Sequence, residues 1–407
     1  MSQTLVNVKA AGDDARPVLW TNTKRGKRIH RRNSQIFYFG VCLGLAAVVG
    51  IVLDGVLRIE RSDKLCLVLD DDFSRGLDPS VWTREVQTSG YGTGQFDWTT
   101  DSDNNAFVRD DKLYIVPTLT NESIGAASFE REGHTIDLGQ LGTCTSPSTA
   151  NCIAANNATV GQIINPVQSA RLTTRASHSI TFGKVSVRAK LPTGDWLWPA
   201  IWMMPREETY GGWPASGEID IMESAGNRPR HRMDSRSRAT VLSTFQFGPA
   251  WYANAGERHT ASRSRWRGYF DSGFHDYVLE WNEHRMRVYI DNPNNLVKEF
   301  RFPKKQSMWH YGRFNEYDHP DGPLRNPWIR STRPNVAPFD QPFYLILDVA
   351  VGGQFFNGDR SDLPWNPSSP QPAALFWRNV DLWYPTWPAS HTDRGMAIDR
   401  VRMWQKC

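Results

Sequence analysis

Long amphipathic helical patterns are scarce in this chain, and after Arg58 it has no internal repeat and no linker-like stretch. A bundle of long helices and a repeat solenoid are therefore excluded, and residues 59–407 are expected to form one domain. The chain has instead short apolar runs bounded by turn residues, with 31 Gly, 25 Pro and 12% aromatic residues. This pattern is typical of an all-β sandwich of two antiparallel sheets.

Net charge is also small over most of the chain. The formal total is +4, and residues 1–35 contribute +6 from eight Lys or Arg against two Asp, so residues 36–407 sum to −2. Because nucleic-acid binding depends on concentrated basic charge, the nearly neutral body argues against a nucleic acid as partner. The polar, basic segment 1–35 is expected to be a disordered tail.

Charged residues are missing from an 18-residue run, 36–53. As a helix this run would span about 27 Å, close to the thickness of the apolar core of a bilayer. A helix in a protein core is disfavoured because the run is apolar on all sides. A cleaved signal peptide is the other alternative, but its basic segment would be unusually long and no small-x-small cleavage site precedes Arg58. We expect a transmembrane signal anchor at 36–58, with residues 1–35 cytoplasmic and the domain lumenal or extracellular, a single-pass type II membrane protein.

The chain has only five cysteines, of which Cys42 lies in the apolar run. The other four make an even number, which suits an oxidising compartment. Cys144 and Cys152 flank a short Ser/Thr/Pro-rich loop, and we expect them to be bridged. Cys66 and Cys407 lie at opposite ends of the folded region, and they are expected to pair if its first and last strands are neighbours. Free buried thiols are the alternative.

Two Asn-x-Ser/Thr sequences, at Asn121 and Asn157, are candidate glycosylation sites in such a compartment. Patterns this short also arise by chance.

Alternating or continuous apolar runs predict the strands of the domain. They are Leu65–Leu69, Lys112–Thr118, Gly183–Leu191, Leu197–Met204, Gly217–Ser224, Tyr277–Trp281, Arg285–Ile290, Phe343–Val351 and Ile398–Trp404. A turn is expected at 70–72. Residues 139–160 and 305–340 form long connections, which in a compact domain are usually functional or stapled.

Three carboxylates, Glu218, Asp220 and Glu223, fall within six residues of one predicted strand. Like charges gathered on one face raise the electrostatic energy, so stability alone would not assemble them. Hydrolysis of a glycosidic bond needs such a group: an acid that protonates the leaving oxygen and a second carboxylate on the other side of the sugar. A solvated acidic strand face and a cation site are the alternatives, although strand spacing suits Ca²⁺ less well than a loop.

The spacing sets a geometric condition. Glu218 and Asp220 share a strand face, but Glu223 is an odd number of residues from Glu218 and would point to the opposite face of a regular strand. One extra residue in a β-bulge at Ile221-Met222 would bring Glu223 beside Asp220. With that bulge, Glu218 serves as nucleophile and Glu223 as acid and then base, while Asp220 separates their pKa values.

The segment Trp213–Asn227 resembles the active-site strand of glycoside hydrolase family 16, in the branch of laminarinases and β-1,3-glucan-recognition proteins. The resemblance extends over nearly all of residues 65–407, through Ser169–Leu172, Arg188–Trp202, Phe274–Trp281, Ala337–Tyr344, Ala350–Gly353 and Ile398–Trp404.

This resemblance implies a concanavalin-like β-jelly roll with a glucan cleft on its concave sheet. It also implies the same roles for Glu218, Asp220 and Glu223. Asp348 stands where the family pattern has Asn, and the apolar run 36–53 is not part of the family's domain.

Aromatic and polar residues near these motifs are candidates for binding sugar, whose rings stack on Trp and whose hydroxyls need polar partners. Trp213 precedes the acidic strand. Trp198 and Trp202 share a strand face, and core packing is the alternative for each of them. Asn227 follows the acidic strand, and Arg171 resembles a family position associated with substrate.

His275 is expected to hydrogen-bond near Glu223, with a buried structural histidine as the alternative. We expect a monomeric, membrane-anchored retaining endo-β-1,3-glucanase that acts on β-glucan and needs no redox or organic cofactor. A structural Ca²⁺ ion stays open because the family sometimes carries one. A wall or matrix transglycosylase is the alternative enzyme, and a non-catalytic glucan receptor is the alternative outside catalysis.

Overall fold

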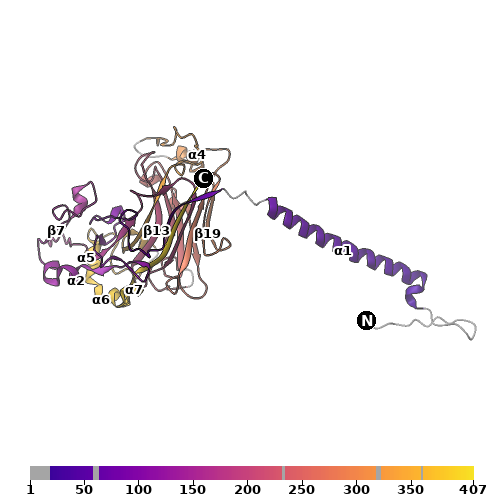
Figure 1. Cartoon of the computed structure of the whole chain (residues 1–407), viewed down its shortest axis with the longest axis horizontal. Coiled ribbons are helices and arrows are strands. Elements are labelled where there is room, and N and C mark those ends of the chain that lie inside the picture. The colour runs from indigo at the N-terminus through magenta and orange to yellow at the C-terminus, as the bar shows by residue number, and fades with distance from the viewer. Residues whose placement is uncertain (1–18, 58–63, 232–233, 318–321, 359–360) are drawn as a thin grey trace, which may run out of the picture. The chain divides into compact units, whose positions relative to one another are not determined.

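The computed structural model describes residues 19–57, 64–231, 234–317, 322–358 and 361–407. The chain divides into two compact units, Met1–Lys64 and Leu65–Cys407 (Figure 1). The expected boundary at residues 58 and 59 lies outside the described residues.

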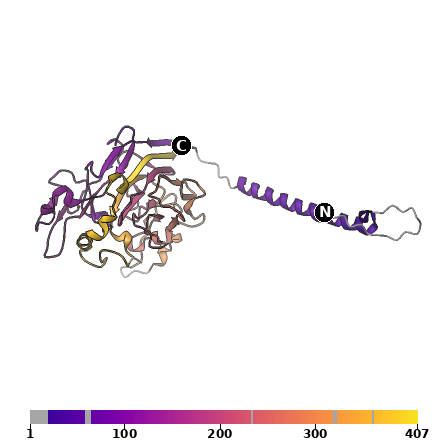
Figure 2. The same cartoon turned by 90° about the horizontal axis from the view of Figure 1, so that it is seen from below.

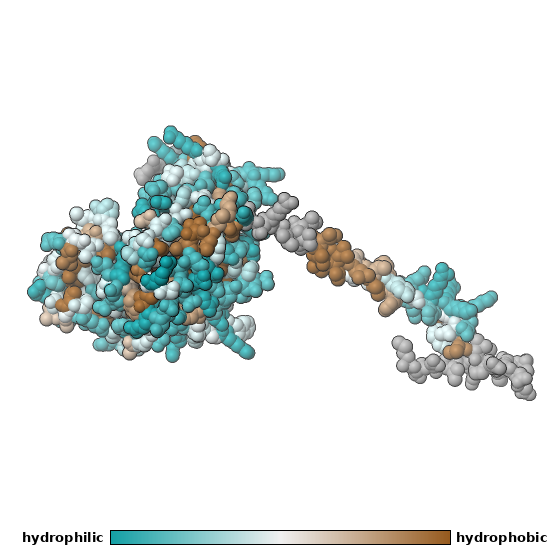
Figure 3. All heavy atoms as spheres, viewed as in Figure 1, coloured by the Kyte–Doolittle hydropathy of each residue, from teal (hydrophilic) through white to brown (hydrophobic). Residues whose placement is uncertain are grey.

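The first unit contains one long helix, α1 (Lys24–Leu57), preceded by the short helix η1 (Trp20–Asn22). Thr23 begins α1, since its hydroxyl accepts a hydrogen bond from the Gly26 N–H at 3.0 Å. The apolar side chains of residues 36–53 are exposed and form a brown band along α1, whose other end is hydrophilic (Figure 3). By length and composition α1 is a candidate membrane span.

One expectation for this unit is wrong. Because α1 begins at Lys24, residues 24–35 of the basic segment are helical rather than disordered. Residues 1–18 of the expected tail lie outside the described residues.

Two large antiparallel sheets build the second unit. Within the described residues the first has the order β19 (Leu296–Arg301), β18 (Arg285–Ile290), β17 (His275–Trp281), β12 (Gly183–Lys190), β21 (Met396–Lys406), β5 (Lys112–Ile115) and β4 (Ala106–Arg109), with β1 (Leu65–Asp71) paired to β21. The second has the order β16 (Thr260–Ser264), β15 (Thr240–Gln246), β14 (Glu218–Glu223), β13 (Leu197–Pro205), β20 (Phe343–Val351), β10 (Arg171–Thr173) and β2 (Thr83–Arg84), with β11 (Ser179–Ile180) paired to β20.

Smaller elements connect these sheets. The short strands are β3 (Asp97–Thr99), β9 (Val167–Ser169), β6 (Thr118–Leu119), β7 (Thr135–Asp137) and β8 (Ile153–Ala155). The short α-helices are α2 (Thr120–Ile124), α3 (Ala126–Phe129), α4 (Met308–Tyr311), α5 (Pro372–Arg378), α6 (Val380–Trp383) and α7 (His391–Arg394). The 3₁₀ helices are η2 (Gly90–Gly92), η3 (Thr149–Cys152), η4 (Trp251–Ala253), η5 (Gly256–His259), η6 (Phe314–Glu316), η7 (Gln354–Phe356) and η8 (Tyr384–Thr386). Helices α2, α5, α6 and α7 gather on one side of the sheets, and α4 lies elsewhere (Figure 1).

The core lies between the two sheets. Alternate side chains of facing strands are fully buried in one cluster, for example Val185 and Val187 of the first sheet and Ile201, Ile219 and Leu347 of the second. Because strand side chains alternate, the opposite face of the second sheet is free to carry polar groups. The expected two-sheet antiparallel sandwich is confirmed.

Among the strands that the sequence predicted, the bounds of β18 and β20 are correct, and those of β1, β12, β13, β14, β17 and β21 are within a few residues. Strands β10, β15, β16 and β19 of the two large sheets were not predicted. Two predictions differ. The expected strand Lys112–Thr118 is two strands, β5 and β6, because Pro117 has no N–H for the ladder. The turn expected at 70–72 begins later, since β1 continues to Asp71.

Both expected disulfides are present. Cys66–Cys407 joins β1 to β21, which pair with Leu65 opposite Lys406, so the first and last strands are neighbours (Figures 1 and 2). Cys144–Cys152 closes the short loop, and Cys42 is an exposed free thiol on α1. Of the two candidate glycosylation residues, Asn157 is exposed and Asn121 is half-buried in α2.

Candidate active site

The acidic strand β14 contains the expected bulge. Trp202 of β13 lies opposite Asp220 and Ile201 lies opposite Met222, so Ile221 is the extra residue. Its ladder with β15 shifts register over the same stretch, between Asp220 and Glu223. Ile221 and Met222 are therefore both fully buried, and Glu223 returns to the face of Asp220. The geometric condition set by the spacing is confirmed.

A glycine starts this strand for a steric reason. Gly217 has φ +82°, and a Cβ there would lie 3.0 Å from Pro338 and 3.3 Å from Phe339 and Phe343. Only glycine meets both constraints without strain. The turn aims the next residue, Glu218, at the polar face.

Glu218 and Asp220 share one hydrogen-bonded group. The Gln246 amide on β15 donates to Glu218 Oε1 at 2.7 Å and to Asp220 Oδ2 at 3.1 Å, and the Trp213 indole donates to Glu218 Oε2 at 2.6 Å. Burial, together with the charges of Glu218 and Glu223, raises the pKa of Asp220 well above its usual range. Protonated Asp220 then donates to Glu218. Burial raises the pKa of Glu218, while the hydrogen bonds from Asp220 and Trp213 oppose that rise and favour its ionised form.

Glu223 has a different environment. The Trp198 indole donates to its Oε1 at 3.0 Å. Burial raises the pKa of Glu223 to about 7, with the charge of Arg236 opposing and that of Glu218 adding to the rise. Around neutral pH the three carboxyl groups thus hold protons to different degrees, which is the arrangement that an acid and a nucleophile need.

These carboxylates lie in a cleft of about 810 Å³ on the polar face of the second sheet. Four tryptophans line its walls: Trp198 and Trp202 from β13, Trp213 from the segment before β14, and Trp251 from η4. Trp198 stacks on Phe355 with ring centroids 4.6 Å apart, and Trp213 and Trp251 are 42% and 73% exposed. Exposed aromatic faces suit the C–H faces of sugar rings, and the polar side chains between them can bind the sugar hydroxyls.

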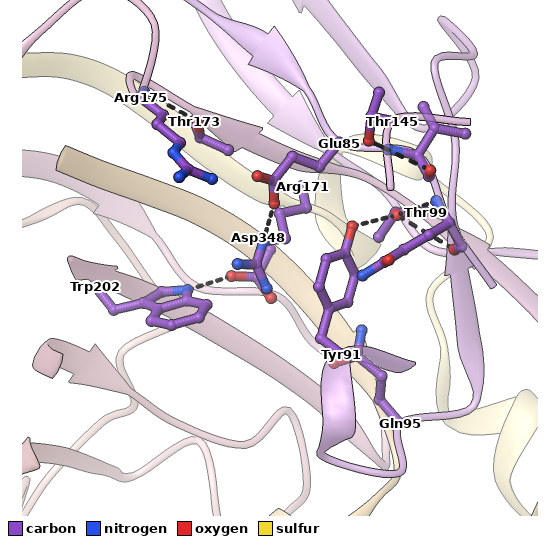
Figure 4. A network of polar contacts seen from close by, with 12 residues as sticks. Glu85, Tyr91, Gln95, Thr99, Thr145, Arg171, Thr173, Arg175, Trp202 and Asp348 are labelled. Carbon is purple, nitrogen blue, oxygen red and sulfur yellow. Dashed lines mark hydrogen bonds and ion pairs between the residues drawn. The ribbon is translucent and has the colours of Figure 1, made fainter. Parts of the chain in front are cut away.

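Arg171 forms the far wall of the cleft, on β10 (Figure 4). Its guanidinium lies over the ring of Tyr91 at 4.0 Å and over that of Trp202 at 4.7 Å, and its Nε is 2.6 Å from Glu85 Oε2. Asp348 lies opposite Arg171 in the ladder and accepts a hydrogen bond from the Trp202 indole at 2.6 Å. Burial raises the pKa of Asp348 to about 6 against the opposing charge of Arg171.

Known proteins are similar to this chain in sequence and in fold. The family profile "Glycosyl hydrolases family 16" matches residues 143–317. The "Beta-1,3-glucan-binding protein" of the shrimp Penaeus monodon is 37% identical over 351 residues, which cover 84% of this chain and 90% of that protein. The chain belongs to glycoside hydrolase family 16.

The similarity to other proteins differs in sequence identity and in the fraction of each chain that is aligned. "Glucan endo-1,3-beta-glucosidase A1" of Niallia circulans is 29% identical, over 73% of this chain but 36% of that enzyme. The crystal structure of a laminarinase from Rhodothermus marinus matches with a TM-score of 0.51 and 24% identity, over 85% of this chain and all of that one. The laminarinase catalytic domain of Thermotoga maritima matches with a TM-score of 0.50 and 23% identity, over 85% and 100%. At these identities the two structures establish the family 16 jelly-roll fold.

The cleft of this family 16 chain brings together seven of the candidate site residues, namely Glu218, Asp220, Glu223, Trp213, Trp198, Trp202 and Arg171. It does not include Asn227 or His275. Asn227 is fully buried, and its side-chain oxygen accepts from the Trp196 N–H at 2.9 Å, so it fixes a turn. His275 lies on β17 of the other sheet, between Asp291 at 2.7 Å and Arg265 at 2.6 Å, so the expected contact near Glu223 is wrong.

Sequence reasoning missed several cleft residues, among them Gln246, which binds Glu218 and Asp220, and Tyr91, which lies under the Arg171 guanidinium. Gln246 ends β15, which was not among the predicted strands. Tyr91 lies in the glycine-rich stretch Ser89–Gly94, where an aromatic residue between turn glycines was an available signal. Among the described residues no group of three or more His, Cys, Asp or Glu side chains is arranged to hold a metal ion.

Proposed function

We propose that this chain is a retaining endo-β-1,3-glucanase. The observation that carries the proposal is the bulged strand β14, which sets three carboxyl groups with different proton affinities on one face of an aromatic cleft. Family membership alone would also suit a protein that only binds glucan.

The chemistry uses side chains of this chain and water. Ionised Glu218 attacks the anomeric carbon, while protonated Glu223 donates its proton to the leaving glycosidic oxygen. The product is a covalent glycosyl-enzyme intermediate and a free chain end. Glu223, now ionised, takes a proton from water, which attacks the intermediate and regenerates Glu218 with the anomeric configuration retained. No redox or organic cofactor takes part.

Asp220 keeps these two roles apart. Protonated Asp220 donates a hydrogen bond to Glu218 and so lowers the charge density of the nucleophile before attack. This hydrogen bond weakens as the glycosyl bond forms and Glu218 loses its negative charge. Its position between the two glutamates also prevents three negative charges from coexisting in a buried site.

The β-1,3 linkage is proposed from the relatives. The Penaeus monodon protein and the Niallia circulans enzyme are both named for β-1,3-glucan. Transfer of the intermediate to a sugar acceptor would use the same residues. The shrimp relative's name, which describes binding, favours a non-catalytic glucan receptor as the second candidate.

The compartment is part of the proposal. Two disulfides suit an oxidising environment, and α1 is long and apolar enough to cross a bilayer. We place the domain on the lumenal or extracellular side of a type II membrane protein, with Asn121 and Asn157 as candidate glycosylation residues, β-glucan as its partner and a monomer as the working unit.

The deciding experiment compares the full chain in detergent micelles with its Glu218→Gln variant on laminarin. We expect new reducing ends from the wild type and none from the variant, with binding of laminarin kept by both. Products analysed with added oligosaccharide acceptors then separate hydrolysis from transfer. Equal binding with no release of reducing ends by the wild type would favour the receptor instead.

A further inference from the structure

A second cavity adjoins the cleft beyond Arg171. This outer chamber of about 230 Å³ shares Tyr91, Arg171 and Met204 with the cleft. Its other walls include Glu85, Thr145, Ser146, Arg175 and Glu208. The two cavities therefore adjoin, and Tyr91 and Arg171 line both of them.

The outer chamber continues the direction of the cleft. The cleft crosses the strands of the second sheet in the order β15, β14, β13, β20 and β10, and the chamber lies at the β10–β2 edge. Neighbouring strands are about 4.8 Å apart, so β10 lies roughly 14 Å from the acidic strand β14. A linear glucan laid across the sheet would reach the chamber more than one sugar ring away from the cleaved bond.

Polar groups line the chamber, in contrast to the aromatic cleft. Glu85 and Arg171 form an ion pair in its wall, between Arg175 and Thr145 (Figure 4). Ser146 Oγ accepts from the Ser148 N–H and from the Asn151 amide, which leaves its own hydroxyl proton available to donate. Glu208 is exposed and supplies a carboxylate acceptor. Donors and acceptors at this density suit the hydroxyl groups of a sugar.

The chamber is also preorganised. Thr145 and Ser146 lie in the loop closed by Cys144–Cys152. The Thr145 N–H donates to the Val86 carbonyl at 3.0 Å, and Thr145 Oγ1 accepts from the Val86 N–H at 2.8 Å. A wall fixed by a disulfide and by backbone hydrogen bonds loses little conformational entropy when a ligand binds.

We propose that the outer chamber binds one further glucosyl residue of a linear β-glucan chain, beyond those held in the cleft. This inference rests on the proposed function, because it takes the ligand of the cleft to be a β-glucan. It makes Ser146 and Glu208 determinants of the preferred chain length, and it gives the stapled loop a role in substrate binding.

The test measures binding by calorimetry with the full-length Glu218→Gln chain in detergent micelles. The probes are linear β-1,3-linked gluco-oligosaccharides of increasing length. We expect affinity to rise when the chain becomes long enough to enter the chamber. Adding Ser146→Trp, which fills the chamber, or Glu208→Ala should remove that rise, a loss of about two- to tenfold for one or two hydrogen bonds, and leave shorter chains unaffected.

Matched controls come from neighbouring exposed residues. Ser148→Trp lies in the same stapled loop and Glu207→Ala beside Glu208, and neither lines the chamber, so both should keep the rise. A rise that persists in both Ser146→Trp and Glu208→Ala would overturn the inference, as would short chains that bind with no gain on lengthening. Failure of the proposed function is a separate result: wild-type protein that releases no reducing ends while the oligosaccharides bind.

Discussion

Glu218 and Glu223 are the same type of side chain in two environments, and the difference between these environments supports the roles proposed for them. Glu218 accepts hydrogen bonds from Trp213, Gln246 and protonated Asp220, all of which stabilise its negative charge. Glu223 has the Trp198 indole and the more distant charge of Arg236, and its pKa of about 7 leaves it protonated in part of the population at neutral pH. The different roles proposed for the two glutamates therefore rest on their neighbours rather than on residue type.

The pH profile should follow these neighbours. Glu223 must be protonated to donate, so with a pKa of about 7 the hydrolysis rate should fall as pH rises above that value. Trp198→Phe removes a hydrogen bond that favours ionised Glu223, so the pKa of Glu223 rises and the alkaline limb should move to higher pH. Trp213→Phe is the matched variant: it should raise the pKa of Glu218 and move the acidic limb to higher pH instead. Profiles of kcat/KM on laminarin decide, and a shift of the wrong limb would contradict the assignment.

The effect of replacing the proposed acid, Glu223, should depend on the leaving group of the substrate. Glu223→Gln cannot protonate the glycosidic oxygen, so hydrolysis of laminarin should fall by about 10²- to 10⁴-fold. An aryl β-glucoside oligosaccharide with an acidic phenol needs no such proton, and formation of the glycosyl-enzyme should be much less affected. Rapid release of the phenol followed by slow turnover is the expected signature. An equal loss on both substrates would indicate that Glu223 is not the acid.

At the scale of the element, the bulge in β14 decides which residues support the core. In the bulged strand Ile221 and Met222 both point inward, whereas in a regular strand Met222 would lie in the cleft. Met222→Ala should therefore cost about 2–5 kcal/mol of unfolding free energy, as for a buried methionine. Denaturant titration measures this cost, with Ile219→Ala as the control that is buried in either geometry. A near-zero cost for Met222→Ala beside a large one for Ile219→Ala would argue for a regular strand.

Strands could be predicted from the sequence where a local pattern determines them. Arg285–Ile290 alternates and Phe343–Val351 is continuously apolar, and both were placed correctly because burial on one or two faces leaves that trace in the residues. The bulge was predicted from the odd spacing of Glu223 together with the requirement that the three carboxylates share one face. These features need only neighbours along the chain.

Features that depend on pairing between distant strands could not be predicted in the same way. His275 was expected near Glu223, but the sequence around His275 does not indicate that β17 belongs to the other sheet. Asn227 directly follows the acidic strand and still turns inward to hold Trp196. Gln246 reaches Glu218 only because β15 pairs with β14, and Tyr91 reaches Arg171 from η2, which is distant from β10 along the chain.

At the scale of the whole molecule, a disulfide links the two ends of the folded domain. Cys66 on the first strand and Cys407 after the last are bridged across a separation of 341 residues. A disulfide that closes a long loop restricts the unfolded chain strongly, so the double variant Cys66→Ser/Cys407→Ser should lose about 2–5 kcal/mol of unfolding free energy. Cys144→Ser/Cys152→Ser, which opens a loop with a separation of 8, should lose less. Denaturation in guanidinium compares the two, and a larger loss for the short loop would show that the first and last strands hold together without their bridge.

Membrane insertion is predicted from α1 alone and does not depend on the folded domain at 65–407. The apolar run of α1 follows a basic segment, which by the positive-inside rule should stay in the cytoplasm. When the full chain is made in the presence of sealed microsomes, we expect it to resist alkaline extraction and residues 65–407 to be protected from added protease. Leu45→Arg/Val49→Arg places two charges within the apolar run, at about 2.5–3.5 kcal/mol each near the helix centre, and should release the chain. Leu141→Arg/Val160→Arg adds the same charges at exposed positions of the domain and serves as the control.

Degradation of residues 65–407 in intact microsomes would contradict the type II orientation, and extraction of the unaltered chain at alkaline pH would show that α1 does not anchor it.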